Sequence, residues 1–479
     1  MIFASPTRAG RALVAFALVL ALAACGGSGN STEERAPAPP SPTGSMPAPA
    51  PPPAPPPPQS SIRVVDGDTG RPIPNARVVV AGQDVQTGGD GAAEVLAAER
   101  EMKVRASAPG YRARTTRVRL AEGKSREVEL WKPSLQWPMY GANPARTQVH
   151  PAISLRPPFK VVWRRGTYGL IEFPAVVWEG VAYVNTMRGA LRAISMEDGR
   201  VLWRKRVGSL TASSPTIDPE RGVLVTTSMS PGDVKVIDLE TGRTRWRFAT
   251  GRAEPSPVIR KGIAYFGAAN GNVYALDLDR RRPRWTFRGG VKITGSPALV
   301  GNRLFFGDYA GRVVALNART GRVVWTGSAG SRVYGTVAVA GGRVFAPSVF
   351  SGLSALSARS GRLLWRVPVG AYLYSSPAVF RGRVYFGTYE GLVYSVSARS
   401  GRILWRRPAG GAVSGAVQVV AGVVYAASFG ARTTAWNWRT GRELLRLPIG
   451  RYVPVSGNGG RLLMHGGGKI WAVEPKRKR

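Results

Sequence analysis

The sequence contains very little cysteine and histidine, and few acidic residues for its length. A single cysteine, Cys25, excludes an intramolecular disulfide framework and a metal site built from several thiolates. The two histidines, His150 and His465, are too few for a multi-histidine metal centre. Only 28 Asp and Glu stand against 67 Lys and Arg, which gives a formal net charge of +39. Such an excess favours anionic partners.

What is present is enough for a packed core. Hydrophobic residues make up 44 % of the 479 positions, so wholesale disorder is excluded and two or more domains, or one large repeat array, are expected. The chain also holds 59 glycines and 38 prolines, with no collagen-like period of three. These excesses indicate many tight turns and a proline-rich tract.

The N-terminal residues predict export. A basic flank containing Arg8 and Arg11 precedes an apolar run over 12–24, which is too short for an ordinary membrane-spanning helix. The run closes as Leu-Ala-Ala-Cys-Gly over 22–26, which resembles the lipobox of bacterial lipoproteins. The resemblance implies a signal peptide over 1–24 and lipidation of Cys25. The alternative is an ordinary cleaved signal followed by an unmodified thiol.

Residues 25–59 have almost no apolar bulk and form a linker. Thirteen of the 38 prolines lie between Pro37 and Pro58, a composition typical of the extended polyproline II conformation. We expect a stiff spacer that holds the following domains away from a membrane anchored at Cys25. A ligand for proline-binding domains is the alternative.

Residues 60–132 alternate between apolar and polar positions and are divided by turn clusters, as at 66–70, 88–91 and 109–110. We predict a small antiparallel β-sandwich of roughly seven strands. The motifs TGRPIPNARV, TGGDG and APGY resemble the carboxypeptidase regulatory-like domain over 61–130. The resemblance implies a spacer or adhesive module without catalysis.

The rest of the chain, 134–479, is a repeat. A Gly-Arg-x-x-Trp motif returns at steps of 43, 39, 40, 40 and 40 residues, and Leu445 fills the next position. Each repeat carries four short apolar segments divided by turns, with no helical periodicity, which is typical of a β-propeller blade. Counting back one step adds a first tryptophan, so the repeat tryptophans are Trp163, Trp203, Trp246, Trp285, Trp325, Trp365 and Trp405.

The ends of the array predict eight blades. The C-terminal segments RYVPVSG, RLLMH and KIWAVEP supply three strands, and the fourth is found around Trp163 at the start of the array. Closure of the last blade by the first strand removes open sheet edges. A ring of seven blades is the alternative, and it leaves two sets of strands without partners. The predicted fold class is therefore all-β, an eight-bladed propeller preceded by a small sandwich.

These repeats resemble the PQQ-binding-like β-propeller family over 136–475. The run from Val236 to Trp246 carries the family's A-x-D-x-x-T-G-x-x-x-W docking motif, and WPMYGANPART over 137–147 resembles its opening segment. The motif is loosened elsewhere, since Ser or Asn often fills the Asp position, Arg281 replaces a glycine and Leu445 replaces a tryptophan. The resemblance implies that the tryptophans dock blade on blade; a ligand stack is the alternative.

The same family includes quinoprotein dehydrogenases, in which carboxylates hold Ca²⁺ beneath the quinone PQQ, commonly with a vicinal Cys-Cys pair. That pair is absent, and 134–479 holds only 16 acidic residues against 51 basic ones. No catalytic constellation can be assigned, so we expect no enzyme, no metal and no cofactor. The chain also resembles, in size and fold, a lipoprotein of the outer-membrane β-barrel assembly machinery. That resemblance implies a binding scaffold instead. The alternative is a PQQ-dependent dehydrogenase that uses PQQ and Ca²⁺.

One face of the propeller is predicted to bind a partner or ligand. Loops from strand D to strand A and from B to C open on the same face and are rich in tyrosine and charge. Capping of blade ends is the alternative role. The candidates are Tyr168, Glu172, Arg188, Lys292, Asp308, Tyr309, Arg332, Tyr334, Tyr372, Tyr374, Tyr389, Glu390 and Tyr452, with Glu254, Phe350 and Phe429 beside them.

On the opposite face, one arginine follows the turn glycine in most repeats, which predicts a basic rim. We expect it to attract protein or anionic envelope material, with solvated surface charge as the alternative and nucleic acid disfavoured by export. The predicted location is the outer face of the cell membrane or the outer membrane. The rim arginines are Arg200, Arg243, Arg322, Arg362, Arg402 and Arg442.

Overall fold

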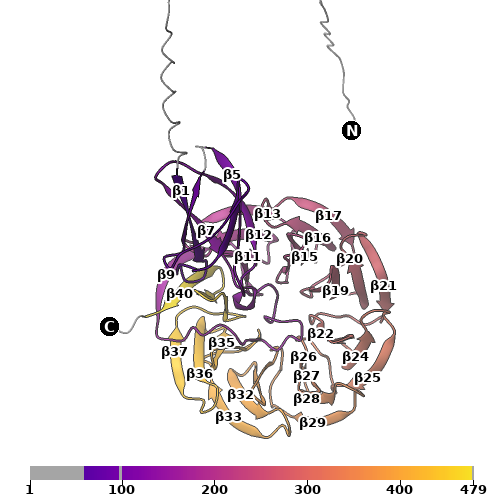
Figure 1. The fold of residues 1–479 in the computed structure, drawn as a ribbon. Coiled ribbons are helices and arrows are strands. Elements are labelled where there is room, and N and C mark those ends of the chain that lie inside the picture. Colours follow the sequence, from indigo (N-terminus) through magenta and orange to yellow (C-terminus); the bar gives the residue numbers. More distant parts are fainter. Residues whose placement is uncertain (1–58, 97–99, 477–479) are drawn as a thin grey trace, which may run out of the picture. The chain divides into compact units, whose positions relative to one another are not determined.

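The computed structural model describes residues 59–96 and 100–476, whose regular secondary structure is almost entirely β-strand (Figure 1). The predicted signal peptide, the lipidation site Cys25 and all but the last residue of the linker lie outside these residues. One short 3-10 helix, η1 (Pro133–Leu135), follows the first domain. Among the described residues, no helix is long and apolar enough to cross a bilayer.

The first domain is a sandwich of seven strands in two sheets, ordered β4-β1-β7 and β3-β2-β5-β6. The sandwich is confirmed, but the expectation of a purely antiparallel arrangement is wrong. β1 and β7, the first and last strands of the domain, lie side by side and pair in parallel. The strands are β1 (Gln59–Asp66), β2 (Arg77–Val80), β3 (Gln83–Gln86), β4 (Ala92–Leu96), β5 (Glu101–Ser107), β6 (Arg114–Arg119) and β7 (Ser125–Leu130).

The alternating residues form the core of this domain. Ile62, Val64, Val78, Val104 and Leu130 are fully buried, and each belongs to the period-two pattern of its strand. Burial of one face of each sheet fixes the register of the strands.

The second domain is a β-propeller whose strands follow one another around a central axis (Figure 1). The first four sheets each contain four antiparallel strands in chain order, from the inner strand A to the outer strand D. Their strands are β10 (Val176–Trp178), β11 (Val181–Asn185), β12 (Ala190–Ser195) and β13 (Val201–Arg206); β14 (Thr216–Asp218), β15 (Val223–Thr227), β16 (Asp233–Asp238) and β17 (Thr244–Ala249); β18 (Val258–Arg260), β19 (Ile263–Gly267), β20 (Asn272–Asp277) and β21 (Arg282–Arg288); and β22 (Ala298–Val300), β23 (Arg303–Gly307), β24 (Arg312–Asn317) and β25 (Val323–Ser328).

Three more sheets repeat this order, and the last of the three gains β8 (Val149–His150) beside its strand A. Their strands are β26 (Ala338–Ala340), β27 (Arg343–Ser348), β28 (Gly352–Ser357) and β29 (Leu363–Val367); β30 (Ala378–Phe380), β31 (Arg383–Gly387), β32 (Leu392–Ser397) and β33 (Ile403–Pro408); and β34 (Gln418–Val420), β35 (Val423–Ser428), β36 (Arg432–Asn437) and β37 (Glu443–Leu447).

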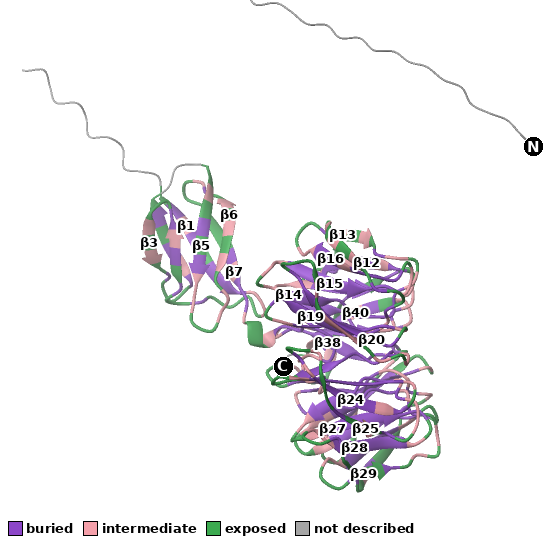
Figure 2. Ribbon diagram, turned by 90° about the vertical axis from the view of Figure 1, so that its right-hand side faces the viewer, coloured by how far each residue is buried: buried purple, intermediate pink, exposed green. Residues whose placement is uncertain are grey.

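A final sheet joins the two ends of the described repeat region. The strands β38 (Val455–Gly457), β39 (Leu462–His465) and β40 (Lys469–Pro475) are completed by β9 (Phe159–Gly166), which pairs antiparallel with β40. The topology therefore contains this closing sheet in addition to the seven above. Buried side chains fill the inner strands of the propeller, and exposed residues gather at its turns (Figure 2).

Each strand D carries a β-bulge beside its neighbour, strand C. In β25, Trp325 pairs with Ala315 and Val323 pairs with Leu316, so the intervening Val324 has no partner. The same irregularity recurs in β13, β17, β21, β29, β33, β37 and β9. The bulge places the residue before each repeat tryptophan at an unpaired position on the outer strand.

The repeat tryptophans connect neighbouring blades. The indole N–H of Trp325 donates to the carbonyl of Ala358 in the next blade at 3.1 Å, and that of Trp365 donates to Ala398 at 3.2 Å. The same contact is made by Trp163, Trp203, Trp285 and Trp405. These rings hold the blades together, as the docking motif implies.

Candidate functional site

The antiparallel order of the blades divides the loops between two faces. The loops from strand D to the next strand A and from B to C end on one face, which we call the loop face; the A–B and C–D turns end on the other, the turn face. All the predicted partner residues lie in loops of the loop face. They come from different blades, so their proximity depends on closure of the ring.

Eight aromatic residues of the loop face form a continuous cluster. Tyr334 and Tyr374 meet edge to face at 5.2 Å between ring centroids, and Phe429 and Tyr452 at 5.1 Å. The remaining contacts between neighbouring rings lie between 5.5 and 6.5 Å. We call these residues the aromatic cluster; they are Tyr309, Tyr334, Phe350, Tyr372, Tyr374, Tyr389, Phe429 and Tyr452.

Three cations lie on the aromatic cluster. The guanidinium of Arg332 lies 5.2 Å from the ring centroid of Tyr309 and 5.6 Å from that of Phe350. Lys292 is 5.0 Å from Tyr309, and Arg451 is 5.2 Å from Phe429. These side chains give the cluster a positive edge.

Part of the aromatic cluster borders an open cleft of about 620 Å³. Phe350, Tyr372, Tyr389 and Glu390 line it together with backbone around Gly370. Phe350 is 60 % exposed and Tyr372 49 % exposed, so large rings stand in solvent where a monomer gains nothing from them. Because these rings are already exposed, they can stack on a partner without first leaving a buried position in the protein.

A second, much smaller cavity of about 50 Å³ lies among the loops that lead into strand A of several blades. Its lining includes Glu172, Glu254, Tyr334 and Tyr140. Burial, followed by the nearby charge of Glu254, raises the pKa of Glu172 to about 7. Glu254 itself is paired with Lys292 at 3.3 Å.

This cavity does not fit the cofactor of the quinoprotein dehydrogenases. Organic cofactor sites usually enclose about 300–1,000 Å³, several times its volume. A hard Ca²⁺ ion takes six to eight oxygen ligands, whereas the cavity offers two carboxylates, of which Glu254 already pairs with a lysine. Over the described ranges, no group of three or more His, Cys, Asp or Glu side chains is placed to hold a metal.

The opening segment occupies the inner ring near this cavity. Trp137 pairs with Val177 in both directions, and the carbonyls of Pro138, Pro144 and Thr147 accept N–H groups from the inner strands of three other blades. The hydroxyl of Tyr140 donates to Ser376 Oγ at 3.1 Å. The segment therefore fills the interior of the ring with chain.

Arg146 anchors the opening segment. Its guanidinium is fully buried and donates to the carbonyls of Tyr140, Ser256, Pro257 and Pro297, and burial lowers its pKa to about 9. Sequence reasoning missed this role, as it missed Arg451 and Tyr140. The sequence did contain a signal for Arg146, because it is the one charged residue of the opening segment over 137–147.

Three predicted residues stand apart from the aromatic cluster. Tyr168 is 86 % exposed and contacts Arg192 rather than another ring, and Arg188 lies in the loop between β11 and β12, in a blade that contributes no ring to the cluster. Asp308 does not face a partner: it is buried and accepts Arg312 Nε at 2.7 Å and the N–H groups of Ala310 and Arg312. The expectation of a partner role for Asp308 is wrong, because a turn needs its carboxylate as a cap.

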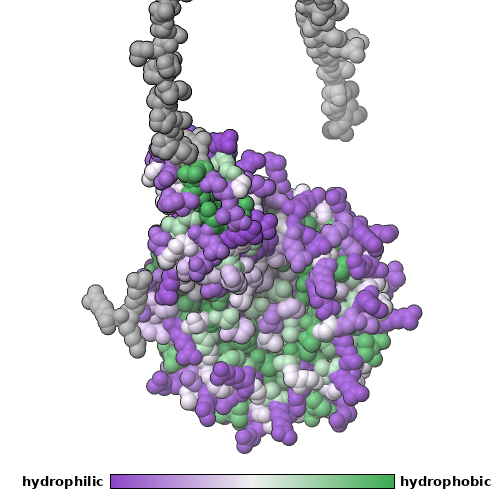
Figure 3. Space-filling model, in the orientation of Figure 1, coloured by the Kyte–Doolittle hydropathy of each residue, from purple (hydrophilic) through white to green (hydrophobic). Residues whose placement is uncertain are grey.

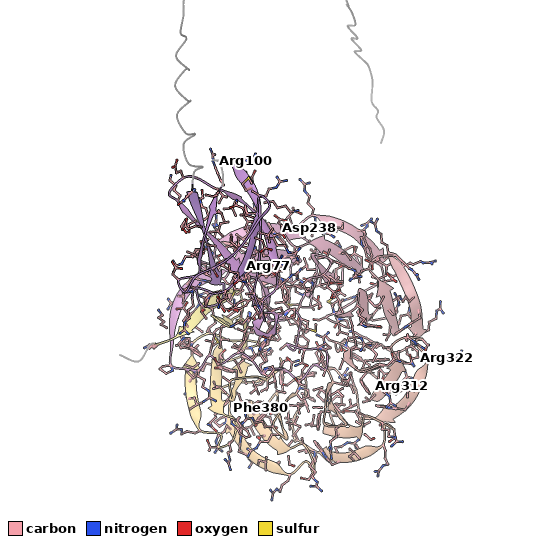
Figure 4. All side chains as sticks on the ribbon, in the orientation of Figure 1. Arg77, Arg100, Asp238, Arg312, Arg322 and Phe380 are labelled. Carbon is pink, nitrogen blue, oxygen red and sulfur yellow. The ribbon has the colours of Figure 1, made fainter. Side chains whose placement is uncertain are left out.

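The predicted rim arginines all lie at exposed turns between strands C and D, on the turn face. Arg200 is paired loosely with Asp198 at 3.7 Å. Figure 4 shows Arg322 on the outside of the ring. His465, which had no assignable partner in the sequence, is buried and accepts the N–H of Ala175 at 3.2 Å, and burial lowers its pKa to about 4.

Comparison with protein families decides the relationship. The family model described as outer membrane protein assembly factor BamB matches residues 159–287 and 269–479, which together cover most of the chain. The chain belongs to the BamB family. A second model, the carboxypeptidase regulatory-like domain, matches residues 61–130. The resemblances to the PQQ-binding-like repeats and to the carboxypeptidase regulatory-like domain are thereby confirmed. Among curated proteins, none matches this sequence.

Solved structures share the fold at low sequence identity. BamB from Moraxella catarrhalis is 16 % identical, with a TM-score of 0.56 over 67 % of this chain and 99 % of that one. The quinohemoprotein alcohol dehydrogenase from Comamonas testosteroni is 13 % identical, with a TM-score of 0.61 over 72 % and 81 %. A europium-containing methanol dehydrogenase is 11 % identical, with a TM-score of 0.61 over 72 % and 98 %. The likeness covers an assembly factor and enzymes, so it shows the fold alone.

Proposed function

We propose that this BamB-family protein is a non-catalytic, extracytoplasmic scaffold that binds a protein partner through its aromatic cluster. The observation that carries the proposal is the unbroken contact of eight rings across blades that are separate in sequence. Tyrosine and arginine are enriched in binding hot spots because they offer large, amphipathic contact areas. The cleft beside Tyr372 and Tyr389 gives a partner's side chain a place to anchor.

The shape of the site favours a protein segment over a small substrate. The cleft is open, its lining combines rings with Glu390, and the guanidinium of Arg332 lies 5.6 Å from the ring centroid of Phe350 at its border. Protein interfaces combine such aromatic anchors with a polar rim. Lipidation at Cys25 would hold this scaffold at the outer face of the cell membrane or at the outer membrane.

The proposal is tested by partner recovery from envelope extracts of the native host. We expect Tyr372→Ala/Tyr389→Ala to reduce recovery of the partner at least tenfold while the unfolding transition stays in place, because loss of a hot-spot ring weakens binding by about 1–2 kcal/mol or more. Tyr168→Ala is the matched control, since Tyr168 is exposed on the same face and outside the cluster. Equal recovery with all three proteins would refute the proposal.

A PQQ-dependent dehydrogenase is the second candidate, favoured by the fold shared with two such enzymes. It predicts a stoichiometric absorbing complex with PQQ and Ca²⁺, followed by dye reduction with alcohols or sugars. The scaffold proposal predicts no change on titration, because the cavity near the axis lacks the volume and the ligands. Saturable binding would favour the enzyme.

A further inference from the structure

The C–D turns on the turn face differ between two sectors of the propeller. In the blade of β14–β17, Asp238 caps the turn and pairs with Arg245 at 2.7 Å. In the blade of β18–β21, Asp277 pairs with Arg284 at 2.9 Å. Both arginines occupy the bulged position that precedes the repeat tryptophan.

The blades of β22–β25, β26–β29 and β30–β33 lack this pair. Asn317 keeps the cap, because its Oδ1 accepts the N–H groups of Arg319 and Thr320 at 2.9 and 3.1 Å, but it carries no charge. Serine caps the next turn in the same way, through Ser357 Oγ. The local fold is therefore preserved while each turn loses its carboxylate.

The turns of these three blades contain six exposed arginines and no acidic residue. Within the described part of the chain, none of their guanidinium groups takes part in an ion pair or a hydrogen bond. Two arginines flank each turn, and the three turns lie on neighbouring blades, as the adjacent outer strands β25, β29 and β33 show in Figure 1. The arginines are Arg319, Arg322, Arg359, Arg362, Arg399 and Arg402.

The same three turns expose aliphatic side chains. Val323 is 51 % exposed, Leu363 42 % and Ile403 46 %, and each directly follows a rim arginine. The bulged residues Val324 and Leu364 are also exposed, where the other sector has its paired arginines. Hydrophobic side chains accordingly appear among hydrophilic ones on the propeller in Figure 3.

We infer that this sector, the arginine–aliphatic arc, docks on an anionic phospholipid bilayer. Its unpaired guanidinium groups would bind headgroup phosphates, and its exposed aliphatic residues would enter the interfacial region. A soluble polyanion would pair with the arginines but would leave the exposed aliphatic residues without a role. A bilayer would bind both the arginines and the aliphatic residues. The inference concerns the turn face, so it stands independently of partner binding at the aromatic cluster.

A fluorophore at a single cysteine tests insertion directly. The full chain carrying Cys25→Ser has no other thiol, so Val323→Cys can be labelled with a polarity-sensitive dye. On vesicles with about a third anionic phosphatidylglycerol, we expect a blue shift at position 323 that high salt reverses, and none on neutral phosphatidylcholine. The control is Thr244→Cys. Thr244 is the first residue of β17, as Val323 is of β25, but its blade carries Asp238 at the turn. An equal shift at position 244 would overturn the inference.

Charge variants test the arginines without disturbing the core. Each basic residue near an anionic surface contributes about 1 kcal/mol, so Arg322→Gln/Arg362→Gln should weaken vesicle binding by about 30-fold. Asn317→Asp/Ser357→Asp restores the carboxylates with the cap intact and should weaken it similarly. Arg200→Gln/Arg243→Gln, two rim arginines outside the arc, is the matched control. Equal losses for both arginine pairs, or binding of soluble polyphosphate with no dye shift on vesicles, would contradict docking on a bilayer.

Discussion

Gly321 lies directly against the indole ring of Trp285, which belongs to the preceding blade. A Cβ atom on Gly321 would be 2.6 Å from Trp285 Cδ2, and the backbone has a φ of +74°. Glycine is needed for two independent reasons, the left-handed backbone and the absent side chain. The turn that carries each rim arginine therefore also packs against the tryptophan of the preceding blade.

This relationship predicts the effect of a single methyl group. Gly321→Ala should lower the free energy of unfolding by about 2–4 kcal/mol, the sum of backbone strain and overpacking against Trp285. Urea denaturation measures the change. Gly301→Ala is the control, because its φ is +54° and a Cβ there meets no atom within 4 Å. Equal losses for the two variants would show that the tryptophan contact contributes nothing.

Arg146 should be among the most sensitive positions of the chain. Arg146→Ala leaves the carbonyls of Tyr140, Ser256, Pro257 and Pro297 without their donor inside the ring. We expect a loss of about 3–5 kcal/mol in the free energy of unfolding. Thermal and urea unfolding test this, with Arg319→Ala as an exposed control that should change stability by less than about 0.5 kcal/mol. A mild effect at Arg146 would mean that the opening segment does not depend on it.

The environment of Glu172 predicts a pH dependence of stability. Its folded pKa, about 7, lies above the ordinary value of 4.5, so folding favours the protonated carboxyl. The resulting stabilisation is complete below about pH 4.5 and is lost as the pH rises to about 7. Glu172→Gln should therefore be less sensitive to pH over this interval than the native chain. Parallel pH profiles of the unfolding midpoint would contradict the burial of this carboxyl.

The repeat fold was predictable because its determinants are local. The spacing of the tryptophans, the turn glycines and the alternating strands are all visible along the chain, and the contact between Trp325 and Gly361 recurs between most neighbouring blades. The completion of the last sheet by β9 also followed from counting strands at the two ends.

The candidate site was predictable only as a list of loop residues. Sequence placed Tyr309, Tyr334 and Tyr389 on one face, but their ring contacts depend on how blades tilt toward the axis. Asp308 was misassigned because a buried turn cap and an exposed acid look alike in sequence. The parallel pairing of β1 with β7 was missed because strand alternation does not encode which strands are neighbours.

Binding of a protein partner at the aromatic cluster can be tested by photo-crosslinking in intact cells of the native host, with a photoreactive amino acid in place of Tyr389 and, separately, in place of Tyr168. We expect one discrete adduct from position 389 that disappears when Tyr372→Ala is added, and none from position 168. No adduct at 389, or the same adducts from both positions, would rule out partner binding at the cluster.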